Sequence, residues 1–282
     1  MSLLQYLGPE ARTAASAQLR LLLRREGGSL IVIFLIAAVQ GVAMAAFGVV
    51  LGITISTGDT ETHVGFSRLL EFQQFFRVGV DRGVVGLIAV WIVCSISALF
   101  WPYGVWSGET PSNRGYHWSL PVERSLHDLM RVWAGGLLLL AVTTVAALAA
   151  LAAAALAGNT AGLAQISGWI WPAWLLGPLV PYLLVSIFTV RFDVSGGWFW
   201  GGIGVLATVT TALTAAGWDA PGRLLGTLLI GELGLVQAVG GPVLALWKKA
   251  PFEARADWLI AWLVWVALFK LLLFVAARAP RR

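Results

Sequence analysis

The chain has 282 residues, of which 59% are apolar and only 12% are charged, against about 25% charged residues in a soluble domain. So few charges exclude a soluble globular fold, a disordered chain and a coiled coil, and they predict an all-α integral membrane protein. The net charge of +5 is ordinary for a membrane protein with basic cytoplasmic ends, and it gives no argument for nucleic acid binding. The single cysteine, Cys94, excludes an internal disulfide.

The N-terminal segment 9–26 combines leucines and arginines at helical spacing. This pattern predicts a helix lying in the membrane interface, or alternatively a plain basic flank that sets orientation. Arg20, Arg24 and Arg25 directly precede the first apolar run, which places the N-terminus in the cytoplasm. That run is too long and starts too late to be a cleaved signal peptide.

Apolar runs of about 20 residues are long enough to cross the hydrocarbon core of a bilayer. The chain has six clear runs, at about 30–54, 84–103, 132–157, 168–190, 198–217 and 258–277. Six spans return the C-terminus, which carries Arg278, Arg281 and Arg282, to the cytoplasm. We therefore expect residues 1–282 to form a single transmembrane domain, multi-pass in the cell membrane, with both termini cytoplasmic.

Segment 107–131 is the longest polar stretch on the predicted cytoplasmic side. Pro121 followed by an acidic residue is typical of a helix start, so the segment can present a short helix to a cytoplasmic partner. The alternative is a solvated connector between two spans. The residues that we assign to partner coupling are Glu109, Arg114, Leu120, Pro121, Val122, Glu123, Arg124, Asp128 and Arg131.

The fifth predicted span begins with closely spaced glycines. Gly197 and Gly201 form a small-xxx-small pair, which allows two helices to approach closely, and we assign them to a dimer seam. Thr208 and Thr211 follow on the same helix. Their hydroxyls either bond back to the helix itself or line a polar substrate path.

Segment 224–247 is long enough to be a seventh span but contains polar and helix-breaking residues. Glu232 and Gln237 are costly in contact with lipid, and Gly240, Gly241 and Pro242 interrupt a helix. The basic residues of the loops are equally consistent with six or seven spans. We therefore predict a re-entrant segment in the outer leaflet, with Glu232 near the exit of the substrate path.

Motifs of several enzyme classes are absent from the sequence. Lys248, Lys249 and Lys270 are the only lysines, and none belongs to a phosphate-binding G-x-x-x-x-G-K-S/T motif. H-E-x-x-H and G-x-S-x-G are absent as well. We therefore expect no catalytic residue, cofactor or metal on this chain.

One motif and the layout together carry a resemblance to a known family. Glu109 follows the second span, Leu120-Pro121-Val122-Glu123-Arg124 comes next, and Arg131 starts the third span. In this order the chain resembles the permease subunit of type-2 ABC exporters. The resemblance implies six spans with an interfacial N-terminal helix, a coupling helix that sits in a groove of an ATPase subunit, and re-entrant helices before the last span.

The resemblance also implies a function. The chain is expected to form the substrate path of an exporter, while ATP and Mg²⁺ bind a separate P-loop ATPase subunit. Two permease chains, identical or paralogous, are expected to face each other through the first, second or fifth span. The alternatives are an ion-coupled or passive carrier without an ATPase, and an intramembrane enzyme or assembly factor. The aromatic-rich composition is compatible with a drug, a lipid or a peptide as substrate.

Overall fold

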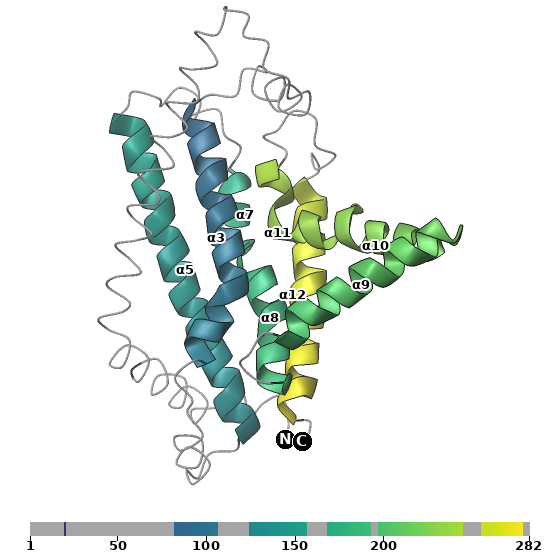
Figure 1. The fold of residues 1–282 in the computed structure, drawn as a ribbon. Coiled ribbons are helices and arrows are strands. Elements are labelled where there is room, and N and C mark those ends of the chain that lie inside the picture. The colour runs from purple at the N-terminus through teal and green to yellow at the C-terminus, as the bar shows by residue number, and fades with distance from the viewer. Residues whose placement is uncertain are drawn as a thin grey trace, which may run out of the picture.

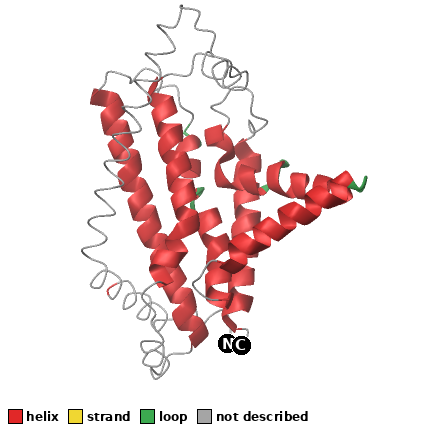
Figure 2. Cartoon of the chain, viewed as in Figure 1, coloured by secondary structure: helices red, strands yellow, loops and turns green. Residues whose placement is uncertain are grey.

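A computed structural model describes residues 20, 82–106, 124–156, 168–192, 197–244 and 255–278. Apart from short turns, these residues are helical, and this part of the chain contains no strand (Figure 2). The predicted all-α architecture is therefore confirmed. The helices are α3 (Arg82–Trp106), α5 (Arg124–Leu156), α7 (Ile170–Leu176), α8 (Leu179–Phe192), α9 (Gly197–Ala215), α10 (Ala220–Ile230), α11 (Leu235–Leu244) and α12 (Arg255–Arg278).

Several of these helices have the length and composition of membrane spans. Ser125–Ala152, Ile170–Phe192 and Asp257–Arg278 are each long and apolar enough to cross a bilayer. The pair α10 and α11, bent by 47°, makes a fourth if it is one broken span. Such helices are consistent with a membrane protein. The predicted first span at 30–54 and the interfacial helix at 9–26, of which only Arg20 is described, lie outside these residues.

Helix α3, helix α5, the consecutive pair α7 and α8, and helix α12 form a bundle (Figure 1). Helix α5 runs in the opposite direction to the others. One hydrophobic cluster joins the beginnings of α3, α7 and α12 to the end of α5, around Trp91, Ile170 and Trp258. A second cluster joins the ends of α3, α8 and α12 to the beginning of α5, around Trp106 and Val132. We refer to these two ends of the bundle as the Ile170 end and the Arg131 end.

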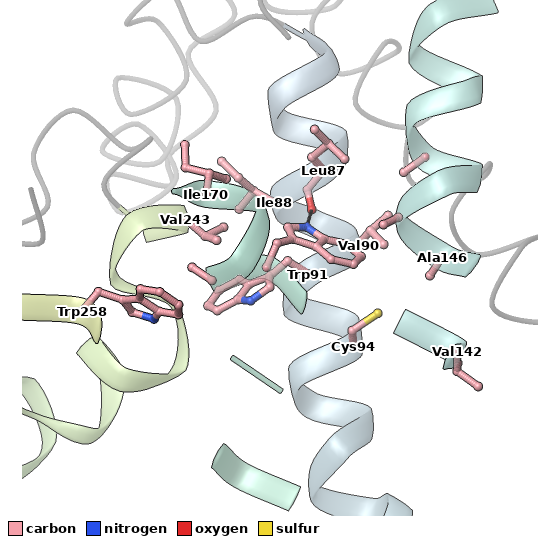
Figure 3. Close-up of a cluster of buried hydrophobic side chains, with 14 residues drawn as sticks. Leu87, Ile88, Val90, Trp91, Cys94, Val142, Ala146, Ile170, Val243 and Trp258 are labelled. Atoms are coloured by element: carbon pink, nitrogen blue, oxygen red, sulfur yellow. Dashed lines mark hydrogen bonds between the residues drawn. The ribbon is translucent and has the colours of Figure 1, made fainter. Parts of the chain in front are cut away.

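Tryptophans fill the core at the Ile170 end (Figure 3). Trp174 lies against α3 and donates a hydrogen bond from Nε1 to the carbonyl oxygen of Leu87, at 3.1 Å. Trp91 and Trp258 are both buried, and Val243 of α11 packs in the same cluster. The indole rings supply large apolar areas, and they hold α3, α7, α11 and α12 together at this end.

Two interrupted helices pack against each other inside the bundle. The fourth apolar run is broken between α7 and α8 at Gly177 and Pro178, while α11 has non-helical backbone angles at Gly240. A Cβ atom added at Gly177 would overlap the carbonyl oxygen of Val239, and one added at Gly240 would overlap the ring of Trp91. Glycine at both positions therefore allows α11 to approach α7 and α3 closely.

Helices α9 and α10 form an arm that projects away from the bundle (Figure 1). Gly217, with φ of +84°, closes the turn between them, a conformation that favours glycine. Gly222 of α10 then packs against Thr214 of α9, because a Cβ there would lie only 3.2 Å from the threonine hydroxyl. Most side chains of the arm are exposed, including Trp200, Leu206 and Leu224.

The observed helix bounds differ from the predicted segments at three places. The predicted span 132–157 is part of α5, which begins at Arg124, so the last eight residues of segment 107–131 belong to that long helix. The predicted span 168–190 is two helices, because Pro178 cannot donate the backbone hydrogen bond that would continue the first. The predicted segment 224–247 is likewise divided between α10 and α11.

Candidate functional site

The end of α3 and the beginning of α5 are joined by one arginine. Arg131 is only 5% exposed, and its Nε and Nη2 atoms donate hydrogen bonds to the carbonyl oxygen of Val105, at 3.2 and 2.6 Å. Its guanidinium carbon lies 4.7 Å from the ring centroid of Trp106. Because the last carbonyls of a helix lack partners within it and carry partial negative charge, Arg131 stabilises the C-terminus of α3.

Two further hydrogen bonds extend this junction to α8. Trp101 donates from Nε1 to the carbonyl oxygen of Gly135, at 3.0 Å, and the Tyr182 hydroxyl donates to the carbonyl oxygen of Val132, at 2.6 Å. Both acceptors lie one turn or less after Arg131 on α5. The arginine, tryptophan and tyrosine side chains thus connect α3, α5 and α8 at the Arg131 end of the bundle, and we call this set the α3–α5–α8 junction.

The structure places the predicted coupling residues in different surroundings. Asp128 and Arg131 are buried inside the bundle, and Nδ1 of His127 lies 3.7 Å from Oδ1 of Asp128. Arg124 is the first residue of α5. The remaining coupling residues lie outside the described part of the chain: Glu109, Arg114, Leu120, Pro121, Val122 and Glu123. The junction therefore joins the end of α3 to the beginning of α5, the two helix ends between which segment 107–123 lies in the sequence.

The predicted dimer-seam glycines are on the arm. Gly197 is the first residue of α9, and Gly201 follows one turn later. No heavy atom lies within 4 Å of the position that a Cβ atom would take at Gly201. A side chain at Gly201 would therefore meet no other described part of the chain.

The threonines assigned to a substrate path are also on α9. Thr208 donates its hydroxyl hydrogen to the carbonyl oxygen of Gly204, at 2.8 Å, and Thr211 donates to that of Ala207, also at 2.8 Å. Both side chains are exposed. Their donors are thus bonded within their own helix, which is one of the two arrangements that the sequence predicts.

Glu232 lies at the vertex between α10 and α11, where its side chain is exposed. The neighbouring carbonyl oxygen of Leu233 accepts a hydrogen bond from Nε1 of Trp265, at 2.8 Å. Trp265 is near the middle of α12, so the vertex lies level with the middle of that helix. Gln237, which is costly in lipid, is 1% exposed and therefore faces protein.

Of the residues that build the junction, the sequence interpretation named Arg131 but neither Trp101 nor Tyr182. Trp101 belongs to no motif, yet its indole nitrogen donates a hydrogen bond to α5. Tyr182 carries no motif, and only its position in an otherwise apolar run distinguishes it. The Gly-Pro pair at 177–178 and the Gly-Gly-Pro sequence at 240–242 are signals that could have predicted two interrupted helices in contact.

Among the described residues, no group of three or more His, Cys, Asp or Glu side chains could hold a metal ion. No family model, curated protein or solved structure matches the chain. Function must therefore be argued from the junction and the arm themselves.

Proposed function

We propose that the chain is the membrane-spanning subunit of an ATP-binding-cassette exporter, which forms the substrate path and couples it to a separate P-loop ATPase. ATP and Mg²⁺ would bind that partner. Segment 107–131 would face the cytoplasm and carry the contact with the ATPase. The α3–α5–α8 junction is the observation that carries this proposal.

The junction supports the proposal because it fixes both ends of the coupling segment. Segment 107–123 leaves α3 at Trp106 and returns at Arg124, and Arg131 ties these two helix ends together through Val105. A force applied to the segment is therefore transmitted to α3 and α5 as one unit, and to α8 through Tyr182. Rigid-body movement of packed helices is an established way to switch between two states. In this arrangement Arg131 and Asp128 position the segment and do not touch the partner.

The arm supports a second permease chain. A helix that is apolar on its exposed face requires either lipid or protein around it, and the glycines of α9 allow a close protein contact. We propose that α9 meets its counterpart in a second copy or a paralogue, with Gly197 and Gly201 at the seam. Thr208, Thr211 and Glu232 would then lie toward the path between the two chains.

The position of α11 supports a re-entrant segment. Helix α11 begins beside the middle of α12, where Trp265 bonds to Leu233, and it ends where Val243 clusters with Trp258. It therefore accompanies only the first half of α12. Ten residues of α-helix extend about 15 Å, half of the ~30 Å hydrocarbon core, so α11 alone is too short to cross the membrane.

The experiment compares two charge reversals in the chain purified with its associated proteins. The unmodified protein should co-purify with a P-loop ATPase in mild detergent. Arg124→Glu, at the start of α5, should leave membrane insertion intact and reduce transport-linked ATP hydrolysis. Arg223→Glu, on the arm, is the matched control and should leave hydrolysis unchanged. Absence of an ATPase, with transport that persists, would contradict the proposal and favour an ion-coupled or passive carrier.

A further inference from the structure

An apolar cavity of about 150 Å³ opens between α5, α8 and α12. Its described lining is aliphatic and aromatic, apart from the Tyr182 hydroxyl and the ammonium group of Lys270, and it includes no acidic side chain. Trp133 and Leu137, on its rim, are 50% and 52% exposed. The cavity therefore opens toward the surroundings of the bundle.

The polar and apolar parts of the cavity are at opposite ends. Trp133, beside Lys270, is two residues from Arg131 and so lies close to the Arg131 end of the bundle. Leu140 and Trp262 line the other end, and seven residues of α5 separate Trp133 from Leu140, about 10 Å along the helix. The cavity is thus an elongated groove with one cation on the side nearer to the Arg131 end of the bundle and apolar walls that extend away from that end.

Lys270 is the only charged residue between Asp257 and Arg278 of α12. Its Nζ atom lies 4.8 Å from the ring centroid of Trp133, and the side chain is exposed. A cation over an aromatic face is partly stabilised, but an ammonium group within an apolar span is costly unless it pairs or reaches the interface. An anion beside Lys270 would supply that pair, and the groove leads directly from this position into apolar surroundings.

We propose that this groove binds one acidic phospholipid from the leaflet at the Arg131 end of the bundle. The phosphate would lie beside Lys270 and Trp133, and one acyl chain would occupy the groove along α5 and α12 toward Trp262. A phospholipid fits because its anionic headgroup lies at the membrane interface and its long apolar chain extends inward. The groove has its cation and its apolar walls in the same order. The inference concerns the lipid-facing surface and does not depend on a partner ATPase.

The test is native mass spectrometry of the full chain in detergent, titrated in parallel with phosphatidylglycerol and phosphatidylcholine. The unmodified protein should retain one phosphatidylglycerol molecule in preference to phosphatidylcholine. Lys270→Gln should weaken phosphatidylglycerol binding about five-fold, the effect of one basic residue near an acidic membrane surface, and should leave phosphatidylcholine binding unchanged. Arg278→Gln, at the end of the same helix, is the matched control and should have little effect.

A second variant tests the apolar part of the groove. A Cβ atom at Gly136 would lie 3.4 Å from the Tyr182 ring and 3.8 Å from Leu179, which are ordinary contact distances, so Gly136→Ala can be accommodated while its methyl group takes up space in the groove. This variant should weaken binding of both lipids. Equal binding of the two lipids to the unmodified protein, or an equal loss in Arg278→Gln and Lys270→Gln, would overturn the proposal. A dimer that forms without lipid and dissociates in Lys270→Gln would show that a second copy covers the groove instead.

Discussion

Helices α3 and α9 are both apolar, yet most of α3 is packed within the bundle and most of α9 is exposed. Leu87, Trp91 and Ala98 of α3 are buried by α5, α8 and α11, whereas Ile203, Leu206 and Val209 of α9 are exposed. The two sequences have similar compositions, so hydropathy predicts a span in both without showing which has a partner within the chain. Close packing of small residues and hydrogen bonds from large polar side chains distinguish the bundle from the arm.

The largest difference in the free energy of unfolding is expected between Gly177→Ala in the bundle and Gly201→Ala on the arm. Gly177→Ala places a methyl group against the backbone carbonyl of Val239, and neither backbone can move without separating α7 from α11. We expect a loss of about 3 kcal/mol in the free energy of unfolding, since overpacking is destabilising. Titration with a denaturing detergent, followed by tryptophan fluorescence, measures this loss.

Gly201→Ala is the matched control on the arm. Nothing lies near the added methyl group in the described chain, so the free energy of unfolding should change by less than about 0.5 kcal/mol. If both alanine variants lose the same stability, the contrast between bundle and arm is wrong.

Removal of the guanidinium at the α3–α5–α8 junction should have the next largest effect. Arg131→Met loses two hydrogen bonds to Val105 and the contact with Trp106. We expect a loss of about 2 kcal/mol, the range for hydrogen bonds from charged groups, measured by the same detergent titration. Arg223→Met, at an exposed position on α10, should remain close to the unmodified protein. Equal stability of the two methionine variants would mean that Arg131 does not hold α3 to α5.

Removal of the tyrosine hydroxyl at the junction should cause a smaller loss of stability than removal of the guanidinium. Tyr182→Phe removes one buried hydrogen bond to Val132 without changing the shape of the ring. The expected loss is about 1 kcal/mol, because a single neutral hydrogen bond has a modest net effect both in soluble proteins and in membranes. A loss above about 3 kcal/mol would show that the hydroxyl has a further partner.

The smallest effects are expected at the arm threonines. Thr208→Val and Thr211→Val each remove a bond to the same helix on an exposed face, and valine keeps the branched shape. Each variant should lie within about 0.5 kcal/mol of the unmodified protein in the detergent titration. A larger loss would mean that the hydroxyls contact another part of the protein.

The sequence predicted the helical class and most helix positions because apolar runs of span length are a strong signal. The run 258–277, for example, corresponds to α12 at Arg255–Arg278, and 198–217 corresponds to α9 at Gly197–Ala215. The run 168–190 was predicted as one span, whereas the structure has two helices that meet at Gly177 and Pro178. A hydropathy average over a span-length window does not detect such a break. The break arises at a single residue, where proline lacks the backbone N–H that would continue the helix.

Tertiary contacts of the candidate site were less predictable. Arg131 was identified from a short motif as a coupling residue, but its hydrogen bonds to Val105 and its burial depend on how α3 and α5 cross. The sequence around Arg131 does not predict how these two helices cross. The six-span topology and the coupling segment remain predictions, since the structure describes neither 30–54 nor 107–123.

The sidedness of residue 249 tests the central claim most directly. If the segment containing α10 and α11 enters and leaves the membrane on one side, six spans result, and segment 107–131 and both termini share the cytoplasm. Cysteine substituted at Lys249, in a Cys94→Ala background, should then react with a membrane-impermeant thiol reagent added to intact cells. Reaction only after the membrane is opened would make the segment a seventh span, place the C-terminus outside, and contradict the exporter-subunit account.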